Sequence, residues 1–167
     1  MIGHEITHSF DNVGADFDST GRVRNWWTPA DYKKFNEAGK ALIAQYDAYK
    51  VFPDLNLNGT LTLGENIADV AGLGASYDAY KASLKGKPAP VINGMTGDQR
   101  FFIAFAQSWL NKSREESLRQ RIATDGHAPD SWRNLTVRNL DAWYPAFNVQ
   151  PGQKLYLPRD KRVKVWG

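Results

Sequence analysis

The sequence predicts a mainly α-helical protein with a single domain. Apolar residues recur at helical spacing in five segments. The connections between these segments are rich in turn-forming residues. A length of 167 residues fits one domain with a sizeable core, and 42% hydrophobic with 23% charged residues is typical of a folded globular chain.

The first two helices are expected at residues 28–50 and 62–84. Thr28 is a good N-cap, and Pro29 suits the first turn of a helix. Aromatic and aliphatic residues then recur every three or four positions, as on the buried face of a helix. The second segment shows the same spacing around Ile67.

Three further helices are expected in the second half of the chain. A capping-box pattern at Thr96 predicts a helix that runs to about Leu110. A weaker helix is predicted near 114–123, and another begins after Pro129. One short extended piece is expected at Leu155–Leu157. The turn-rich connections are residues 12–27, 52–59 and 85–97.

Composition limits the kinds of site that the chain can form. Cysteine is absent, which excludes disulfides and thiolate metal sites. A metal site must therefore use carboxylates and the three histidines. No apolar run approaches the roughly 18 residues that a transmembrane helix needs, so no transmembrane segment is expected in this chain.

The positive charge is concentrated in a basic C-terminal tail, residues 154–167. Five basic residues and one acid give this tail a net charge of +4, whereas the whole chain carries +3. Such a short tail is more often solvated surface than a phosphate-binding patch, and no nucleic-acid-binding motif accompanies it. No nucleic-acid partner is expected. Salt-sensitive binding that disappears when the tail is deleted would indicate otherwise.

His4, Glu5 and His8 form the pattern H-E-x-x-H. Histidines four residues apart on a helix share one face, so both imidazoles can reach one Zn²⁺ at about 2.0–2.1 Å. Glu5 then lies on the neighbouring flank, where it can deprotonate a metal-bound water. The alternative interpretation is two surface histidines one turn apart.

Glu65 is the strongest candidate for a third ligand, because it stands early in the second predicted helix. Asp69 follows four residues later on the same face, where it can accept the outer N–H of a ligating imidazole. Alone, the two acids would be explained as first-turn acids favoured by the helix dipole. The two histidines favour the metal-binding interpretation.

His127 and Arg133 belong to a polar, turn-forming segment. Both are suitable donors to the oxyanion that develops when an amide is attacked. As isolated residues they would be ordinary surface groups.

These motifs together resemble the C-terminal part of the neprilysin and endothelin-converting-enzyme family of zinc endopeptidases. They follow the order of that family over essentially the whole chain. The matching stretches are Gly3–Asp11, Asp18–Trp27, Leu61–Leu73, Phe101–Trp109, Thr124–Arg133 and Val165-Trp166. The fold implied is a thermolysin-like zincin (gluzincin) helical catalytic core, truncated at its N-terminal side.

The resemblance implies a zinc site with one Zn²⁺ per chain. His4, His8 and Glu65 would be its ligands. Asp69 would orient a zinc-binding histidine, and Asp11 would act in the same way.

The resemblance also implies catalytic and substrate-binding roles. Glu5 would be the general base, and His127 would stabilise the tetrahedral intermediate. Arg133 would contact the substrate backbone. Trp109 would line an apolar pocket for a hydrophobic residue after the cleaved bond, in peptides rather than folded proteins.

The chain departs from the family in two respects. Cysteines that several animal members have are replaced here, at positions that correspond to Ala41, Leu110, Val149 and Val163, which fits a bacterial-type member. The several hundred residues that precede the zinc motif in the family are also absent. They include an Asn-Ala-x-Tyr strand that binds substrate and a helical domain that roofs the cavity.

Residues 1–167 are therefore expected to be the C-terminal part of the catalytic domain of a larger enzyme, with the N-terminal part as its partner. The intact protein is expected to be a zinc endopeptidase acting outside the cytoplasm: periplasmic, secreted or membrane-anchored. The chain alone is expected to be a poor catalyst. The alternative is a non-enzymatic, zinc-stabilised interaction module whose exposed aromatic residues form the interface.

Overall fold

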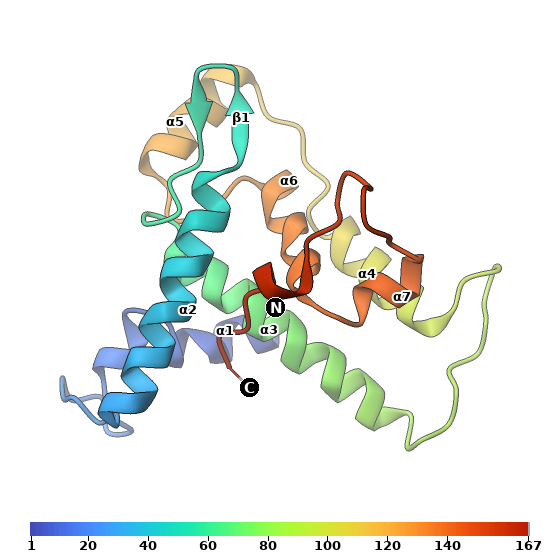
Figure 1. Cartoon of the computed structure of the whole chain (residues 1–167), viewed down its shortest axis with the longest axis horizontal. Coiled ribbons are helices and arrows are strands. Elements are labelled where there is room, and N and C mark those ends of the chain that lie inside the picture. Colours follow the sequence, from blue (N-terminus) through green and yellow to red (C-terminus); the bar gives the residue numbers. More distant parts are fainter. Residues whose placement is uncertain (167) are drawn as a thin grey trace.

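Helices form most of the regular structure in the computed structural model, which describes residues 1–166 (Figure 1). The α-helices are α1 (Ile2–Thr7), α2 (Pro29–Asp47), α3 (Leu63–Ser83), α4 (Gly97–Gln107), α5 (Glu115–Thr124), α6 (Asp130–Arg133) and α7 (Trp143–Phe147). The short 3-10 helices are η1 (His8–Phe10), η2 (Gly14–Asp16), η3 (Asn134–Asn139) and η4 (Arg159–Lys161). The strands in this part of the chain are β1 (Lys50–Phe52) and β2 (Leu55–Asn56). The predicted mainly α class is confirmed.

α3 is the central element of the fold. Figure 1 shows it running through the middle of the molecule, with α1 behind it and α2 crossing its N-terminal half. Five consecutive residues of α3, from Asn66 to Val70, are buried. Because α3 is covered on several sides, the side chains at its N-terminal end are held in fixed positions.

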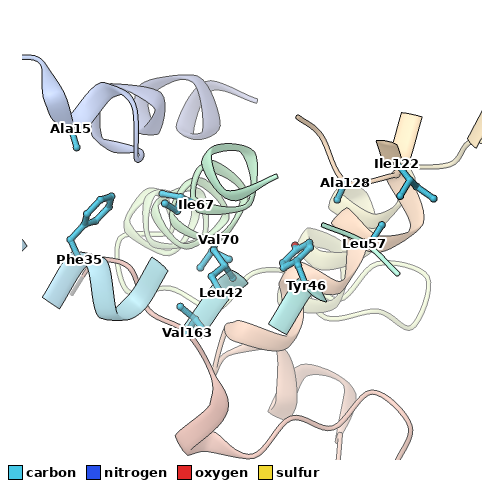
Figure 2. Close-up of a cluster of buried hydrophobic side chains, with 10 residues drawn as sticks. All are labelled: Ala15, Phe35, Leu42, Tyr46, Leu57, Ile67, Val70, Ile122, Ala128 and Val163. Atoms are coloured by element: carbon cyan, nitrogen blue, oxygen red, sulfur yellow. The ribbon is translucent and has the colours of Figure 1, made fainter. Parts of the chain in front are cut away.

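The larger hydrophobic core lies between α2 and α3 and continues to α5 and the C-terminal segment (Figure 2). Leu42 and Tyr46 of α2 and Ile67 of α3 have no exposed surface. Burying a side chain of this size stabilises the fold by about 1.5–3 kcal/mol. The core residues drawn in Figure 2 are Ala15, Phe35, Leu42, Tyr46, Leu57, Ile67, Val70, Ile122, Ala128 and Val163.

A second, smaller core packs on the other half of α3. It joins Leu73 of α3 to Phe102 of α4, Val137 of η3, and Trp143 and Tyr144 of α7. α3 thus contributes side chains to both cores. Residues 65–69 lie on α3 before Leu73, its residue in the second core.

α2 begins as expected, with the Thr28 hydroxyl accepting a hydrogen bond from the backbone N–H of Asp31. It ends at Asp47, three residues before the predicted end, because Lys50 enters a strand. The helix from Thr96 also has its predicted capping box, made with Gln99. α3 and α5 match the predicted ranges closely.

The β1–β2 hairpin was not expected, since residues 52–59 were predicted to be a turn-rich connection. The hairpin is antiparallel and pairs Lys50 with Asn56 and Phe52 with Leu55. α5 holds its tip: the Arg119 guanidinium bonds both carboxylate oxygens of Asp54 at 2.9 and 3.0 Å. The same guanidinium lies 4.2 Å from the centre of the Phe52 ring. Contacts with a distant helix therefore decide the structure of this short segment.

The prediction of a single helix after Pro129 is wrong. The chain forms one turn, α6, and then tightens into the 3-10 helix η3. Residues three apart eclipse one another in a 3-10 helix, which places Thr136 and Asn139 together in the interior. There Tyr46 lies 3.2 Å from the Thr136 hydroxyl, and the amide of Gln45 pairs with the amide of Asn139. Buried polar partners on α2 thus outweigh the helical preference of this segment.

The extended piece predicted at Leu155–Leu157 is also wrong. Its backbone forms no strand, because the Leu157 carbonyl accepts hydrogen bonds from the Tyr144 hydroxyl and from Arg162. Arg162 lies 3.4 Å from the centre of the Tyr144 ring and 2.8 Å from an oxygen of Asp141.

Four of the five basic residues of the C-terminal tail are exposed, as expected for a solvated surface. Arg162 is the exception, and its neighbour Val163 belongs to the larger core. The tail is therefore anchored to the domain. Among residues 1–166, no helix has both the length and the apolar character that crossing a bilayer requires.

Candidate metal centre

The two histidines of the H-E-x-x-H motif share one face of the N-terminal helical segment. His4 lies in α1, and His8 begins η1, which continues α1 directly. Their Nε2 atoms are 3.2 Å apart, and the rings meet nearly at right angles. The spacing of four residues thus produces the predicted juxtaposition.

A carboxylate holds the opposite nitrogen of each imidazole. Nδ1 of His4 lies 2.9 Å from Asp69, and Nδ1 of His8 lies 2.7 Å from Asp11. Asp11 is itself fixed by the backbone N–H groups of Val13 and Gly14, both at 2.8 Å. With Nδ1–H donated to a carboxylate in each ring, the Nε2 lone pairs point toward each other. A proton or a metal ion between the two nitrogens would remove the repulsion between these lone pairs.

Glu65, in the first turn of α3, completes the cluster. Its Oε2 lies 3.1 Å from Nε2 of His4, and its Oε1 lies 3.6 Å from Nε2 of His8. One ligand atom from each of the three residues lies within 4.8 Å of the others. Bonds of 2.0–2.1 Å at tetrahedral angles separate ligand atoms by about 3.3–3.4 Å, which matches these distances.

The Glu65 carboxylate carries the second sign of a metal site. Its Oε2 is buried and makes no well-aligned hydrogen bond with residues 1–166, although Nε2 of His4 and Nε2 of His127 each lie 3.1 Å away. Burying a carboxylate charge is costly unless it is paired, and a cation held between Glu65 and the two histidines would compensate it. The residues present therefore fit a tetrahedral Zn²⁺ with two imidazole ligands and one carboxylate ligand.

Asp69 also forms a buried ion pair with Arg133. Nε and Nη2 of Arg133 each lie 2.8 Å from an oxygen of Asp69. Burial opposes ionisation of Asp69, but hydrogen bonds from His4 and Arg133 outweigh it and hold the pKa of Asp69 below its usual range. The same hydrogen bond with Asp69 raises the pKa of His4. Asp69 therefore remains a carboxylate and orients His4.

Arg133 links this pair to Trp109. The guanidinium carbon lies 4.0 Å from the centre of the indole ring, which is a cation–π contact. The indole Nε1 is buried without a hydrogen-bond partner among the described residues. Trp109 thus lies next to the site, and its contact with Arg133 was not foreseen. Its role as a pocket wall stays a prediction.

His127 lies beside the metal ligands, between α5 and α6. Its Nε2 is 3.1 Å from Oε2 of Glu65, and its side chain is 46% exposed. Oδ1 of Asp125 lies 2.8 Å from Nδ1 of His127 and also accepts the backbone N–H of that residue, at 2.9 Å. The side chain of His127 is thus open to solvent, and Asp125 holds its Nδ1 atom, the ring nitrogen that does not face Glu65.

Asp125, which bonds His127, was not among the site residues predicted from the sequence. It stands two residues before His127 in a stretch already noted, so the pattern D-x-H was the available signal. Glu5 is exposed on α1, and its side chain makes no hydrogen bond or ion pair with residues 1–166. The fold brings the other predicted site residues into one connected group, while Glu5 is placed only by its position on the helix.

Comparison with protein families agrees with this geometry. Residues 1–163 match the model of peptidase family M13. The chain belongs to peptidase family M13. The M13 relatives include a neutral endopeptidase of Lactobacillus helveticus, 36% identical over 99% of this chain and 24% of that protein. Human endothelin-converting enzyme-like 1 is 41% identical over 89% of this chain and 20% of that protein. The resemblance to neprilysin and endothelin-converting enzyme is therefore confirmed.

Solved structures of M13 proteins show the same fold. The zinc metalloprotease Zmp1 of Mycobacterium tuberculosis, solved with an inhibitor, superposes with a TM-score of 0.96 at 44% sequence identity. That comparison covers 99% of this chain and 26% of Zmp1. The chain thus spans about a quarter of the length of the M13 proteins it resembles.

Proposed function

We propose that this chain is the zinc-binding catalytic segment of an M13 endopeptidase, with one Zn²⁺ held by His4, His8 and Glu65. The observation that carries the proposal is the convergence of one ligand atom from each of the three residues. A carboxylate already holds Nδ1 of each imidazole, which leaves Nε2 of each ring free to bind the metal. Zinc bound here would lower the pKa of a coordinated water toward about 7 and polarise the scissile carbonyl.

Glu5 serves as the general base in this proposal. Glu5 follows the proposed ligand His4 in α1. Because successive side chains of a helix point in different directions, the Glu5 carboxylate lies on the flank beside the face that carries the two histidines. It takes a proton from the attacking water and passes it to the leaving nitrogen. Peptide hydrolysis then needs no covalent enzyme intermediate.

His127 and Arg133 supply positive charge for the tetrahedral intermediate and the substrate backbone. The imidazolium form of His127 has an N–H on both nitrogens, so it can bond Asp125 and a developing oxyanion together. Asp69 fixes two of the three guanidinium nitrogens of Arg133. Trp109, against the guanidinium, would line the pocket for a hydrophobic residue on the carboxyl side of the cleaved bond. The expected substrates are therefore peptides.

An exposed apolar face favours a second role. Ile2 is 80% exposed and Ile6 62%, and the aromatic side chains of Phe10, Trp26 and Trp166 are each at least 40% exposed. Exposed apolar groups gathered in this way are typical of interaction sites. The second candidate is a zinc-stabilised module whose apolar face packs against polypeptide equivalent to the rest of an M13 protein. We propose that the complete enzyme acts outside the cytoplasm, as the resemblance to neprilysin implies.

A fluorogenic peptide assay of the chain, with zinc and with a chelator, tests the proposal. Cleavage by the chain alone is expected to be slow, to require zinc and to disappear in Glu5→Gln, while Glu37→Gln on α2 serves as the matched control. Chelator-insensitive cleavage, or full activity in Glu5→Gln, would contradict the endopeptidase proposal. Stoichiometric zinc binding without cleavage under any condition would favour the second candidate.

A further inference from the structure

α1, which carries His4, and α3, which carries Glu65 and Asp69, are in direct backbone-to-backbone contact. Figure 1 shows α1 behind α3, and Gly3 of α1 lies against Gly72 of α3. A Cβ atom built on Gly72 would lie 2.5 Å from the backbone nitrogen of His4 and 2.7 Å from its Cα. A Cβ atom built on Gly3 would lie 2.7 Å from the Gly72 carbonyl oxygen.

These contacts leave no room for any side chain. The obstructing atoms at Gly72 are backbone atoms: the two nearest belong to His4, and the third belongs to Gly3. A methyl group at Gly72 would therefore have to move α1 and His4 away from α3, because backbone atoms cannot rotate aside as a side chain can.

The metal cluster depends on this separation. Nε2 of His4 lies 3.1 Å from Glu65, and Nδ1 of the same ring lies 2.9 Å from Asp69. Both partners belong to α3, so a shift of α1 by about 1 Å would lengthen both contacts beyond useful metal-binding and hydrogen-bonding distances.

Backbone conformation gives no other reason for glycine at this position. Gly72 lies inside the regular helix α3, where glycine is less favourable than alanine. Gly74 lies two residues later in the same helix, and a Cβ atom built there would have no neighbour within 4 Å. The two glycines therefore differ in their contact with α1.

We propose that Gly72 is a positioning residue of the metal centre: its missing side chain sets the distance between α1 and α3 and thereby the spacing of the zinc ligands. The inference rests on the proposed zinc site. The spacing of the ligand atoms then depends on the ligand residues and also on the crossing of α1 and α3, which lies 7 residues after Glu65 in the sequence.

The test compares Gly72→Ala with Gly74→Ala in the whole chain. Zinc affinity is measured by competition with a chromophoric chelator, and the ligand geometry by the visible spectrum of the Co²⁺-loaded chain. Gly72→Ala should bind zinc at least about tenfold more weakly, with a weaker tetrahedral Co²⁺ absorption and an unchanged helical circular dichroism signal. Gly74→Ala should keep the zinc affinity and the spectrum of the starting chain.

Gly3→Ala tests the same crossing from α1 and should repeat the result of Gly72→Ala. Wild-type affinity and spectrum in either crossing variant would overturn the inference. So would loss of the helical signal in both, because that result would indicate a general packing role. If the unmodified chain binds no zinc, the proposed function itself fails, and this outcome is distinct from the others.

Discussion

The imidazole of His4 and the carboxylate of Asp69 are hydrogen-bonded at 2.9 Å although they stand 65 residues apart in the sequence. Asp69 is 3% exposed and holds the His4 ring and the Arg133 guanidinium together. This carboxylate therefore connects His4, a proposed zinc ligand, to Arg133, which is proposed to contact the substrate.

Asp69→Ala should weaken zinc binding by roughly 10- to 100-fold, because a ligating histidine loses the group that fixes its ring and tautomer. Competition with a chromophoric chelator measures the effect. Asp78→Ala is the matched control, since Asp78 lies exposed on the same helix. Equal zinc affinity in the two variants would show that Asp69 does not orient His4.

Arg133→Met should lower the free energy of unfolding by about 3–5 kcal/mol, because it leaves the buried Asp69 carboxylate without its bidentate partner. For a chain of this size, Tm should fall by roughly 10 °C. Thermal denaturation followed by circular dichroism measures the change. Arg159→Met, at a side chain that is 82% exposed, should change stability by less than about 0.5 kcal/mol. A loss below 1 kcal/mol in Arg133→Met would argue against a tightly coupled pair.

His127→Ala should lower kcat for peptide cleavage by about 10²- to 10³-fold and leave zinc affinity unchanged, because in the proposed mechanism His127 contacts the substrate and lies outside the group of three converging ligands. Asp125→Ala should lower kcat less, since it removes only the group that orients His127. Steady-state kinetics and a zinc titration on each variant separate the two effects. If His127→Ala loses zinc together with activity, the assignment is wrong.

The stability provided by Asp141 should depend on pH. Its hydrogen bond with Arg162 holds the pKa of Asp141 below its usual range. A carboxyl group whose pKa is lowered by folding stabilises the protein above its unfolded pKa of about 4, and this stabilisation is lost as the pH falls through the folded value. Asp141→Asn should therefore lower Tm at pH 7, and the difference from the unmodified chain should narrow below about pH 4. If the difference in Tm between Asp141→Asn and the unmodified chain stays constant from pH 7 to pH 3, the ion pair between Asp141 and Arg162 does not contribute to stability.

Local sequence signals predicted the elements whose structure is decided locally. The Thr28 cap, the Thr96–Gln99 capping box and the four-residue spacing of His4 and His8 all appear in the structure as expected. In each case the interacting groups lie within one helical turn of each other. Such contacts depend on spacing alone.

Features that depend on distant partners were not predicted. The β1–β2 hairpin is held by Arg119, which lies 65 residues after Asp54 in the sequence. The tightening at η3 follows from the pairing of Asn139 with Gln45 across 94 residues. The contact between Trp109 and Arg133 likewise requires the relative placement of α6 and the turn that follows α4. Tertiary contacts of this kind are absent from any periodic pattern in the sequence.

The central claim is that His4, His8 and Glu65 hold one zinc ion. X-ray absorption spectroscopy at the zinc edge, on the chain loaded with one equivalent of Zn²⁺, tests it most directly. The structure predicts a four-coordinate ion with two imidazole nitrogens at about 2.0–2.1 Å and oxygen ligands at about 2.0–2.2 Å. His8→Ala should lose one imidazole contribution. A zinc ion surrounded only by water oxygens, or an unchanged imidazole signal in His8→Ala, would contradict the claim.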